Sequence, residues 1–144
     1  MSMYQLFQTN PDLEKNGVII DYGQFRVTLA RAGGANKKFG RLLEARTKPH
    51  KRSIQTETMD PEKGLDIMRE VYAETIVLNW ETKQDEKFVQ GIEDQNDPSR
   101  VIPLTKENLV ATFKALPDLF SDLQEQAMKA ALFRDEVRED DAKN

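Results

Sequence analysis

Residues 60–80 read DPEKGLDIMREVYAETIVLNW, and this stretch decides the fold. Asp60 is suited to cap the free N–H groups of a first helical turn, and Pro61 occupies the position where a missing N–H costs nothing. Large apolar side chains then recur at three- and four-residue spacing, at Leu65, Met68, Tyr72, Ile76 and Trp80. A second flank is apolar as well, at Ile67, Val71 and Leu78. The pattern predicts one long core helix over 61–80, covered on more than one side.

Length and composition limit what surrounds this helix. The chain has 144 residues, enough for one domain and its core. It has no cysteine and a single histidine, His50, so a disulfide scaffold, a thiolate metal site and a histidine cluster are excluded. The first 17 residues lack the apolar run of a signal peptide, and no stretch reaches membrane-spanning length. We therefore expect an intracellular protein with no membrane partner, metal or cofactor.

On the N-terminal side of the helix, apolar residues alternate in two short runs. Val18, Ile20 and Tyr22 share one face with Phe25, Val27 and Leu29, and the residues between the runs form a turn. The pattern predicts a β-hairpin over 18–29. Before it, residues 1–16 hold a few apolar side chains and an Asn10-Pro11 break, which predicts a short packed arm.

Between the hairpin and the long helix, Gly33-Gly34 interrupts the alternation. Asn36 is a candidate cap for a helix over 36–47 that Pro49 ends. Positive charge is concentrated here, with Lys37, Lys38, Arg41, Arg46, Lys48, Lys51 and Arg52 against the single acid Glu44.

On the C-terminal side, residues 81–100 are polar and predict an exposed loop, although Phe88, Val89 and Ile92 leave a short hairpin as the alternative. Thr105 then caps a predicted helix over 106–115, and Pro117 opens a second helix over 117–134. Residues 135–144 are acidic and predict a solvated tail. The expected fold is α+β: a mostly helical single domain (1–134) with an N-terminal β-hairpin and a C-terminal helical pair.

No catalytic constellation emerges from the residues. His50 has no identifiable nucleophile or orienting acid, and Gly33-Gly34 matches no phosphate-binding motif. The basic run could neutralise phosphates, but it lacks the interleaved aromatic residues of a nucleic-acid binder, so a solvated face or a contact for an acidic protein surface is favoured. Trp80 is read as core, with an interface anchor as the alternative. We expect a protein that is not an enzyme.

Four segments carry a family resemblance: LEKNGVIIDYGQFRVTLARAGGANKKF (13–39), TKPHKRSIQTETMD (47–60), REVYAETIVLNWE (69–81) and IPLTKENLVATFKALPDLFSDLQEQAMKAALFR (102–134). In this order they resemble the tail assembly chaperones of long-tailed, non-contractile bacteriophages. The resemblance implies a host-cytoplasmic protein of virion morphogenesis that binds the tape measure protein, helps recruit tail tube subunits and is absent from the mature virion. Self-association is also expected. None of the resembling motifs is catalytic.

Two other classes share the size and composition. A minor structural tail or head-tail connector protein would be found in the virion. A nucleic-acid-binding phage protein would use Lys37 to Arg52 and would lose affinity steeply with salt. We expect no nucleic-acid partner.

The partner surface is predicted on the C-terminal helices, with the basic run assisting electrostatically. The candidate residues are Phe113, Leu116, Phe120, Lys37, Lys38, Arg41, Lys51 and Arg52. For each apolar member taken singly, core packing is the favoured role.

The resemblance also implies a longer product made by programmed frameshifting. Ala142-Lys143-Asn144 can be encoded by a slippery adenine-rich run, and the acidic residues before it would then link the domain to an extension.

Overall fold

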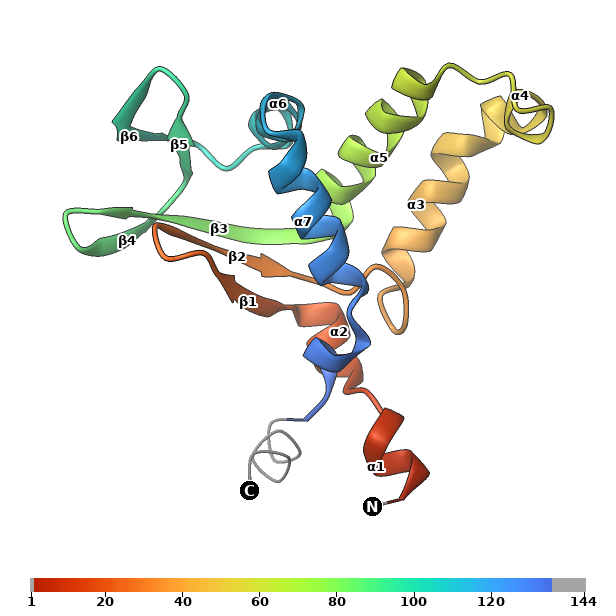
Figure 1. Cartoon of the computed structure of the whole chain (residues 1–144), viewed down its shortest axis with the longest axis horizontal. Coiled ribbons are helices and arrows are strands. Elements are labelled where there is room, and N and C mark those ends of the chain that lie inside the picture. The colour runs from red at the N-terminus through yellow and green to blue at the C-terminus, as the bar shows by residue number, and fades with distance from the viewer. Residues whose placement is uncertain (1, 136–144) are drawn as a thin grey trace.

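The computed structural model describes residues 2–135, in which helices pack on antiparallel β-structure (Figure 1). The helices are α1 (Met3–Phe7), α2 (Pro11–Asn16), α3 (Lys37–Thr47), α4 (Lys51–Gln55), α5 (Pro61–Thr75), α6 (Lys106–Ala115) and α7 (Pro117–Met128), with the 3-10 helices η1 (Lys48–His50) and η2 (Ala130–Phe133). The strands are β1 (Val18–Asp21), β2 (Phe25–Leu29), β3 (Val77–Gln84), β4 (Lys87–Gln90), β5 (Ile92–Asp94) and β6 (Asp97–Ile102). The predicted α+β domain, its N-terminal hairpin and its C-terminal helical pair are confirmed.

The main sheet has the strand order β1-β2-β3-β4, and every pair in it is antiparallel. The predicted hairpin is its first pair, with Ile20 opposite Val27. Its turn is closed by the amide of Gly23, which donates a 2.7 Å hydrogen bond to the Asp21 carboxylate. Alternation buries Val27 fully and leaves Ile19 exposed, as period-two side-chain placement requires.

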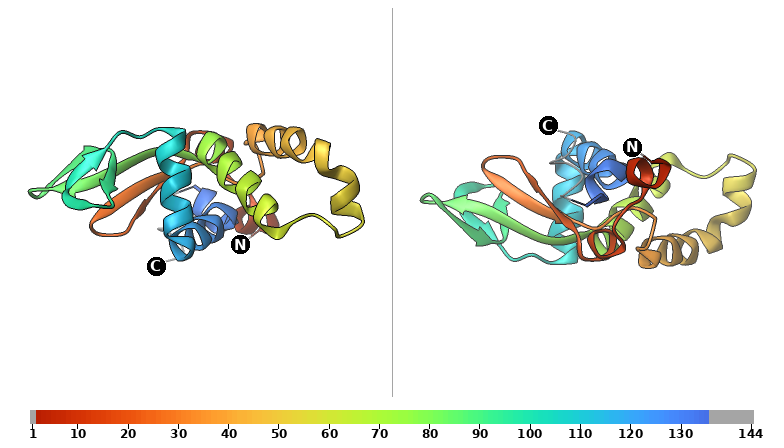
Figure 2. Two further views of the ribbon diagram at one scale, coloured as in Figure 1. Left: turned by 90° about the horizontal axis from the view of Figure 1, so that it is seen from above. Right: turned by 90° about the horizontal axis from the view of Figure 1, so that it is seen from below.

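Helices α5, α6 and α7 lie together over one side of this sheet and enclose the core (Figures 1 and 2). The large buried side chains of this cluster include Leu29, Tyr72, Ile76, Trp80, Phe113, Phe120 and Leu123. The core is therefore built jointly by strands and helices that are distant in the sequence.

The predicted helix over 61–80 is correct only in its first part. Asp60 accepts a 3.0 Å hydrogen bond from the amide of Glu62, as expected, but α5 ends at Thr75 and the chain continues as β3. Ile76 and Trp80 are four residues apart, a spacing that suits a helix and equally suits one face of a strand. The alternation of buried Trp80, half-buried Glu81 and buried Thr82 is typical of a strand, and pairing with β2 supplies its hydrogen bonds.

Both apolar flanks predicted for α5 are largely buried. Ile67 and Val71, assigned to the second flank, are buried, whereas Leu65 of the first stripe is 44% exposed. Tyr72 of the first stripe is 2% exposed and belongs to the core cluster, so Leu65, near the start of α5, is the one exposed position of that stripe within the helix.

The prediction of an exposed loop at 81–100 is wrong. Strand β3 runs on to Gln84 and turns back into β4, and a second two-stranded sheet follows from β5 and β6. Asp85 and Glu86 both have positive φ, as a two-residue hairpin turn requires. The alternative hairpin around Phe88, Val89 and Ile92 was the correct reading. Much of the surface of these strands faces solvent, so their sequence is polar and lacks the clear apolar alternation that predicts a strand.

Helices α3 and α4 with η1 between them form a projection from the body, here called the basic lobe (residues 37–55; Figures 1 and 2). The predicted helix is confirmed over Lys37–Thr47, but Pro49 does not end the helical path, because it lies inside η1. Asn36 does not cap α3. Its side-chain amide instead donates to the carbonyl oxygens of Arg31 (2.9 Å) and Thr75 (3.2 Å).

The C-terminal pair begins as predicted and ends early. The Thr105 hydroxyl accepts a 3.1 Å hydrogen bond from the amide of Asn108 at the start of α6. Helix α7 stops at Met128, short of the predicted 134, and η2 follows with Phe133 fully buried. Of the predicted acidic tail, residues 136–144 lie outside the described residues.

The packed arm predicted over residues 1–16 is present only in its second part, where α2 packs against η2 and buries Glu14. The Asn10-Pro11 break is real, since it separates α1 from α2. Helix α1, however, buries none of its residues, and its large apolar side chains are 42–70% exposed.

Candidate partner-binding cleft

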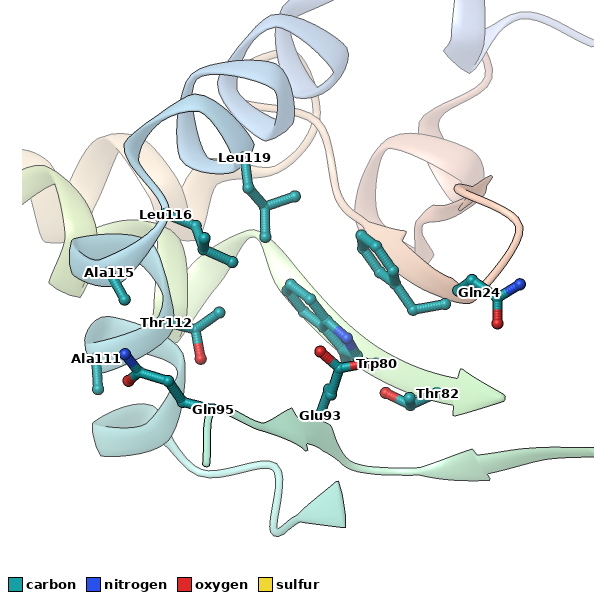
Figure 3. A pocket seen from close by; sticks show the side chains of 11 residues that line it. Gln24, Trp80, Thr82, Glu93, Gln95, Ala111, Thr112, Ala115, Leu116 and Leu119 are labelled. Carbon is teal, nitrogen blue, oxygen red and sulfur yellow. The ribbon is translucent and has the colours of Figure 1, made fainter. Parts of the chain in front are cut away.

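A cleft of about 380 Å³ opens between the tip of the β1–β2 hairpin, strand β3, the β5–β6 hairpin and the α6–α7 corner (Figure 3). Its floor is aromatic, made by Phe25 and Trp80. Aliphatic side chains form one wall, and they are Ala111, Ala115, Leu116 and Leu119. Polar side chains complete the lining, and they are Gln24, Thr82, Glu93, Gln95 and Thr112. A volume of this size with mixed lining is typical of a site for a few side chains of a ligand or partner.

The floor is positioned by the pairing of β2 with β3. Trp80 lies opposite Val27, and Phe25 lies opposite Thr82, so the two aromatic rings are diagonal neighbours on one face. Their centroids are 5.4 Å apart and their planes differ by 7°. Tyr22 stacks on Phe25 at 4.7 Å and 14°. The hairpin tip therefore adds a stacked row of aromatic rings to the strand that carries Trp80.

The aliphatic wall depends on a sharp corner between two helices. Leu116 is the single residue between the two helices, the C-cap of α6 and the N-cap of α7. Pro117 occupies the first position of α7, where proline is favoured. With one connecting residue, the corner holds Leu116 at the cleft with 52% of its surface exposed. Leu119, in the first turn of α7, also lines the cleft (Figure 3).

The opposite rim is held by contacts around Gly91. Its amide donates to the Trp80 carbonyl (3.0 Å), and its carbonyl accepts from the Thr82 hydroxyl (2.8 Å). Gly91 has φ 138°, and a Cβ there would approach the Ile102 carbonyl oxygen to 2.8 Å, so glycine is required. The strand that follows carries Glu93, the one charged side chain among the lining residues.

A second carboxylate, that of Asp122 on α7, lies beside the aromatic row. It accepts a 2.5 Å hydrogen bond from the Tyr22 hydroxyl, which ties the hairpin tip to α7. Burial, together with this hydrogen bond and the charge of Asp122, raises the pKa of Tyr22 well above its ordinary value. The hydroxyl therefore stays protonated and acts as a structural donor.

The variant Tyr22→Phe should lower the free energy of unfolding by about 1.5–3 kcal/mol, because a half-buried carboxylate loses its donor. Chemical denaturation at neutral pH measures this. Tyr4→Phe is the matched control, since Tyr4 is 69% exposed, and its effect should stay within about 0.5 kcal/mol. The folded-state pKa of Tyr22 is raised, so the difference between wild type and Tyr22→Phe should persist up to the ordinary tyrosine pKa and shrink above it. Equal stability of the two proteins at neutral pH would contradict the role of this bond.

The predicted partner residues fall in three different places. Phe113 and Phe120 are core residues, 0% and 4% exposed, and they stack on each other at 4.8 Å, so they contribute nothing to the surface. Leu116 lines the cleft. The predicted cationic residues, Lys37, Lys38, Arg41, Lys51 and Arg52, are all exposed on the basic lobe.

The lobe and the cleft do not form one continuous surface. Helix α5 packs on α3 on one side and on α6 on the other, and so stands between them (Figure 1). A partner that uses both would therefore have to contact two separate faces, and the electrostatic assistance of the basic run stays a prediction.

The prediction that Trp80 is a core residue is confirmed, since it is 3% exposed, although its ring also lines the cleft. The cleft itself was not predicted, because Phe25 was assigned to the hairpin and Glu93 and Gln95 to a loop. The weak strand pattern after Trp80 was the one sequence signal from which the cleft could have been predicted.

Among residues 2–135, no group of three or more His, Cys, Asp or Glu side chains is arranged to hold a metal ion. Within the same residues, no helix has both the length and the apolar character needed to cross a membrane.

A family model described as the YdaY prophage protein matches residues 34–144, well over half of the chain. The matched part includes the basic lobe, β3 to β6 and both C-terminal helices, whereas Gln24 and Phe25 of the cleft precede it. No curated protein and no solved structure matches.

Proposed function

Because the chain belongs to the YdaY prophage protein family, we propose that it acts in phage tail morphogenesis as a tail assembly chaperone. In this role it binds the tape measure protein in the host cytoplasm, helps recruit tail tube subunits and is absent from the mature virion. The proposal is supported by the phage origin of the family and by the resemblance of residues 13–134 to such chaperones.

The observation that carries the proposal is the aromatic cleft. A floor of stacked aromatic rings and a wall with the exposed Leu116 suit one or two apolar side chains from one face of a partner helix. Tape measure proteins are long helical proteins that offer such faces repeatedly. Exposed apolar surface at a fixed cleft is also a common mark of a protein interaction site.

We also propose that the cleft binds and does not catalyse. The tyrosine beside it has a raised pKa and is held as a hydrogen-bond donor, so it is not an activated nucleophile or base. Glu93 is exposed, whereas a catalytic carboxylate is usually held rigidly and partly desolvated. The proposed activity requires no cofactor.

Co-expression with the candidate tape measure protein, followed by pull-down in low and high salt, tests the proposal. Wild type should capture the tape measure protein in both conditions, because an apolar contact resists salt. Leu116→Ser should weaken capture about tenfold or more, since it removes an apolar side chain from the wall while serine still suits the position before α7. Trp80 is the only tryptophan, so its fluorescence gives a second, direct readout of cleft occupancy.

Ile19→Ser is the control for this experiment, because Ile19 is 60% exposed on β1 and does not line the cleft. Its capture should equal that of wild type. If Leu116→Ser captured as much tape measure protein as wild type, the cleft would not be the binding site. If wild type captured none, the chaperone proposal would be contradicted. Detection of the protein in purified virions by mass spectrometry would favour the alternative, a minor structural tail or head-tail connector protein.

A further inference from the structure

The first turns of α3 carry a patch of positive charge, here called the basic face. It is formed by Lys37, Lys38 and Arg41, three exposed residues whose spacing places them on one side of the helix. Within the described part of the chain, no ion pair includes any of the three, whereas Arg46 of the same helix is paired with acids of α5. The first turn of α3 also contains no acid. The basic face therefore favours a negatively charged occupant.

Residues 136–144, here called the acidic segment, have the opposite charge. They read EVREDDAKN, with four acids against two bases, and the acids Glu139, Asp140 and Asp141 are consecutive. The segment has one large apolar side chain, so charge is the main property by which a surface could recognise it. Its charge complements that of the basic face.

The acidic segment leaves the described chain on the side of the molecule where α3 begins. Asp135 accepts a 2.8 Å hydrogen bond from the side-chain amide of Asn10, at the start of α2. One helical turn later, Glu14 pairs with Arg31 (2.6 Å) and lies against Gly34, three residues before α3. Along this route Asp135 and Gly34 are separated by about 20 Å at most.

The length of the acidic segment suits this separation. Four to six residues of extended chain span about 13–20 Å, so the acids at 139–141 can reach the basic face. Lys51 and Arg52 lie at the far end of the basic lobe, beyond α3, which is itself about 16 Å long (Figure 1). The same three acids do not reach that end of the lobe.

We propose that the acidic segment docks on the basic face of α3 in the same chain, with the carboxylates of residues 139–141 paired to the three cations. Surface ion pairs are weak singly, but the short tether gives the segment an effective concentration in the millimolar range at this face. The contact is autoinhibitory, because a docked segment excludes the acidic surface of any other protein from the basic face. The inference goes beyond the proposed chaperone function and does not depend on it.

Paramagnetic broadening of amide signals in the full-length protein tests the proposal. The chain has no cysteine, so Ala142→Cys carries a nitroxide label at one position, next to the three acids. In low salt the label should broaden the signals of residues 37–41 strongly. The broadening should fall about twofold or more in Asp140→Asn/Asp141→Asn, whose segment has the same length and two fewer charges. High salt should remove this difference by screening the ion pairs.

Two charge reversals on the lobe locate the contact. Lys37→Glu/Lys38→Glu/Arg41→Glu should reduce the broadening at the start of α3 at least as much as the change in the acidic segment does. Lys51→Glu/Arg52→Glu is the control, because these cations are out of reach, and it should leave the broadening unchanged. A mixture of isotope-labelled protein without nitroxide and nitroxide-labelled protein without the isotope should show no broadening, since the contact lies within one chain.

Affinity for an acidic probe measures the autoinhibition. A fluorescent hexaglutamate peptide should bind Asp140→Asn/Asp141→Asn about threefold or more tightly than wild type, because the basic face is then less often covered. Asp85→Asn/Glu86→Gln is the matched control, since it also removes two negative charges, at the exposed β3–β4 turn. Its affinity for the probe should equal that of wild type.

Each of four outcomes would overturn the proposal. Broadening that Asp140→Asn/Asp141→Asn leaves unchanged would mean that charge does not hold the segment, and broadening that survives reversal of the basic face would place the contact elsewhere. Broadening in the mixture would show a contact between chains. Equal affinity of wild type and Asp140→Asn/Asp141→Asn for the probe would exclude autoinhibition. The chaperone proposal is tested separately, because capture of the tape measure protein is measured with variants of the cleft.

Discussion

Replacing Trp80 by alanine should lower the free energy of unfolding by about 3–5 kcal/mol. The side chain is 3% exposed, and its loss removes the stacking partner of Phe25 and opens a cavity between β3 and the helical layer. Since a domain of this size is stable by about 5–15 kcal/mol, the variant should unfold at a much lower denaturant concentration. Denaturation followed by circular dichroism measures the change, because the variant has no tryptophan to observe.

Trp80→Phe is the control, since it keeps an aromatic ring against Phe25 and leaves a smaller cavity. Its loss should be clearly less than that of the alanine variant. A loss below about 1 kcal/mol for Trp80→Ala would place the residue at the surface, contrary to its burial.

Replacing Arg31 by alanine should lower the free energy of unfolding by about 3 kcal/mol. Its guanidinium group donates a 2.6 Å hydrogen bond to the Glu14 carboxylate, whose side chain is only 4% exposed, and removing one partner leaves a buried charge without compensation. We expect a loss of stability at the low end of the range for breaking a buried ion pair, because the Arg31 side chain keeps 24% of its surface in contact with solvent. Chemical denaturation measures it.

The double variant Glu14→Leu/Arg31→Met is the companion experiment. Apolar residues of similar size leave no unpaired charge, so the double variant should be more stable than Arg31→Ala. If Arg31→Ala alone cost less than about 1 kcal/mol, the buried pair would have no structural importance.

The Glu14 carboxylate also explains why the second residue of the Gly33-Gly34 pair is a glycine. Gly34 has φ 55°, and a Cβ there would collide with the Glu14 carboxylate. The sequence identified Gly33-Gly34 as a corner and gave no reason for glycine at the second position. The reason is a contact with residue 14, twenty positions away in the chain, which no local pattern records.

The site was harder to predict than the fold. Leu116 was the one predicted apolar partner residue to reach the cleft, because it stands at a helix corner, whereas Phe113 and Phe120 have the same apolar character and are enclosed. Apolar spacing on a helix identifies a face, and the neighbours of that face decide whether it is core or surface. The charge of the basic lobe was correctly located, but its separation from the cleft depends on where α5 packs.

The sequence by itself determined the elements whose signals are local. The hairpin turn at Gly23, the caps at Asp60 and Thr105 and the helix break at Pro117 each act within a few residues, so the chain encodes them wherever it is placed. Tertiary structure decided the rest. Whether Ile76 to Trp80 is helix or strand depends on β2 offering hydrogen-bond partners, and the cleft exists because residues from 24 to 119 converge on Trp80. Hydrogen bonding and burial across such separations are properties of the packed chain, and spacing along the sequence does not specify them.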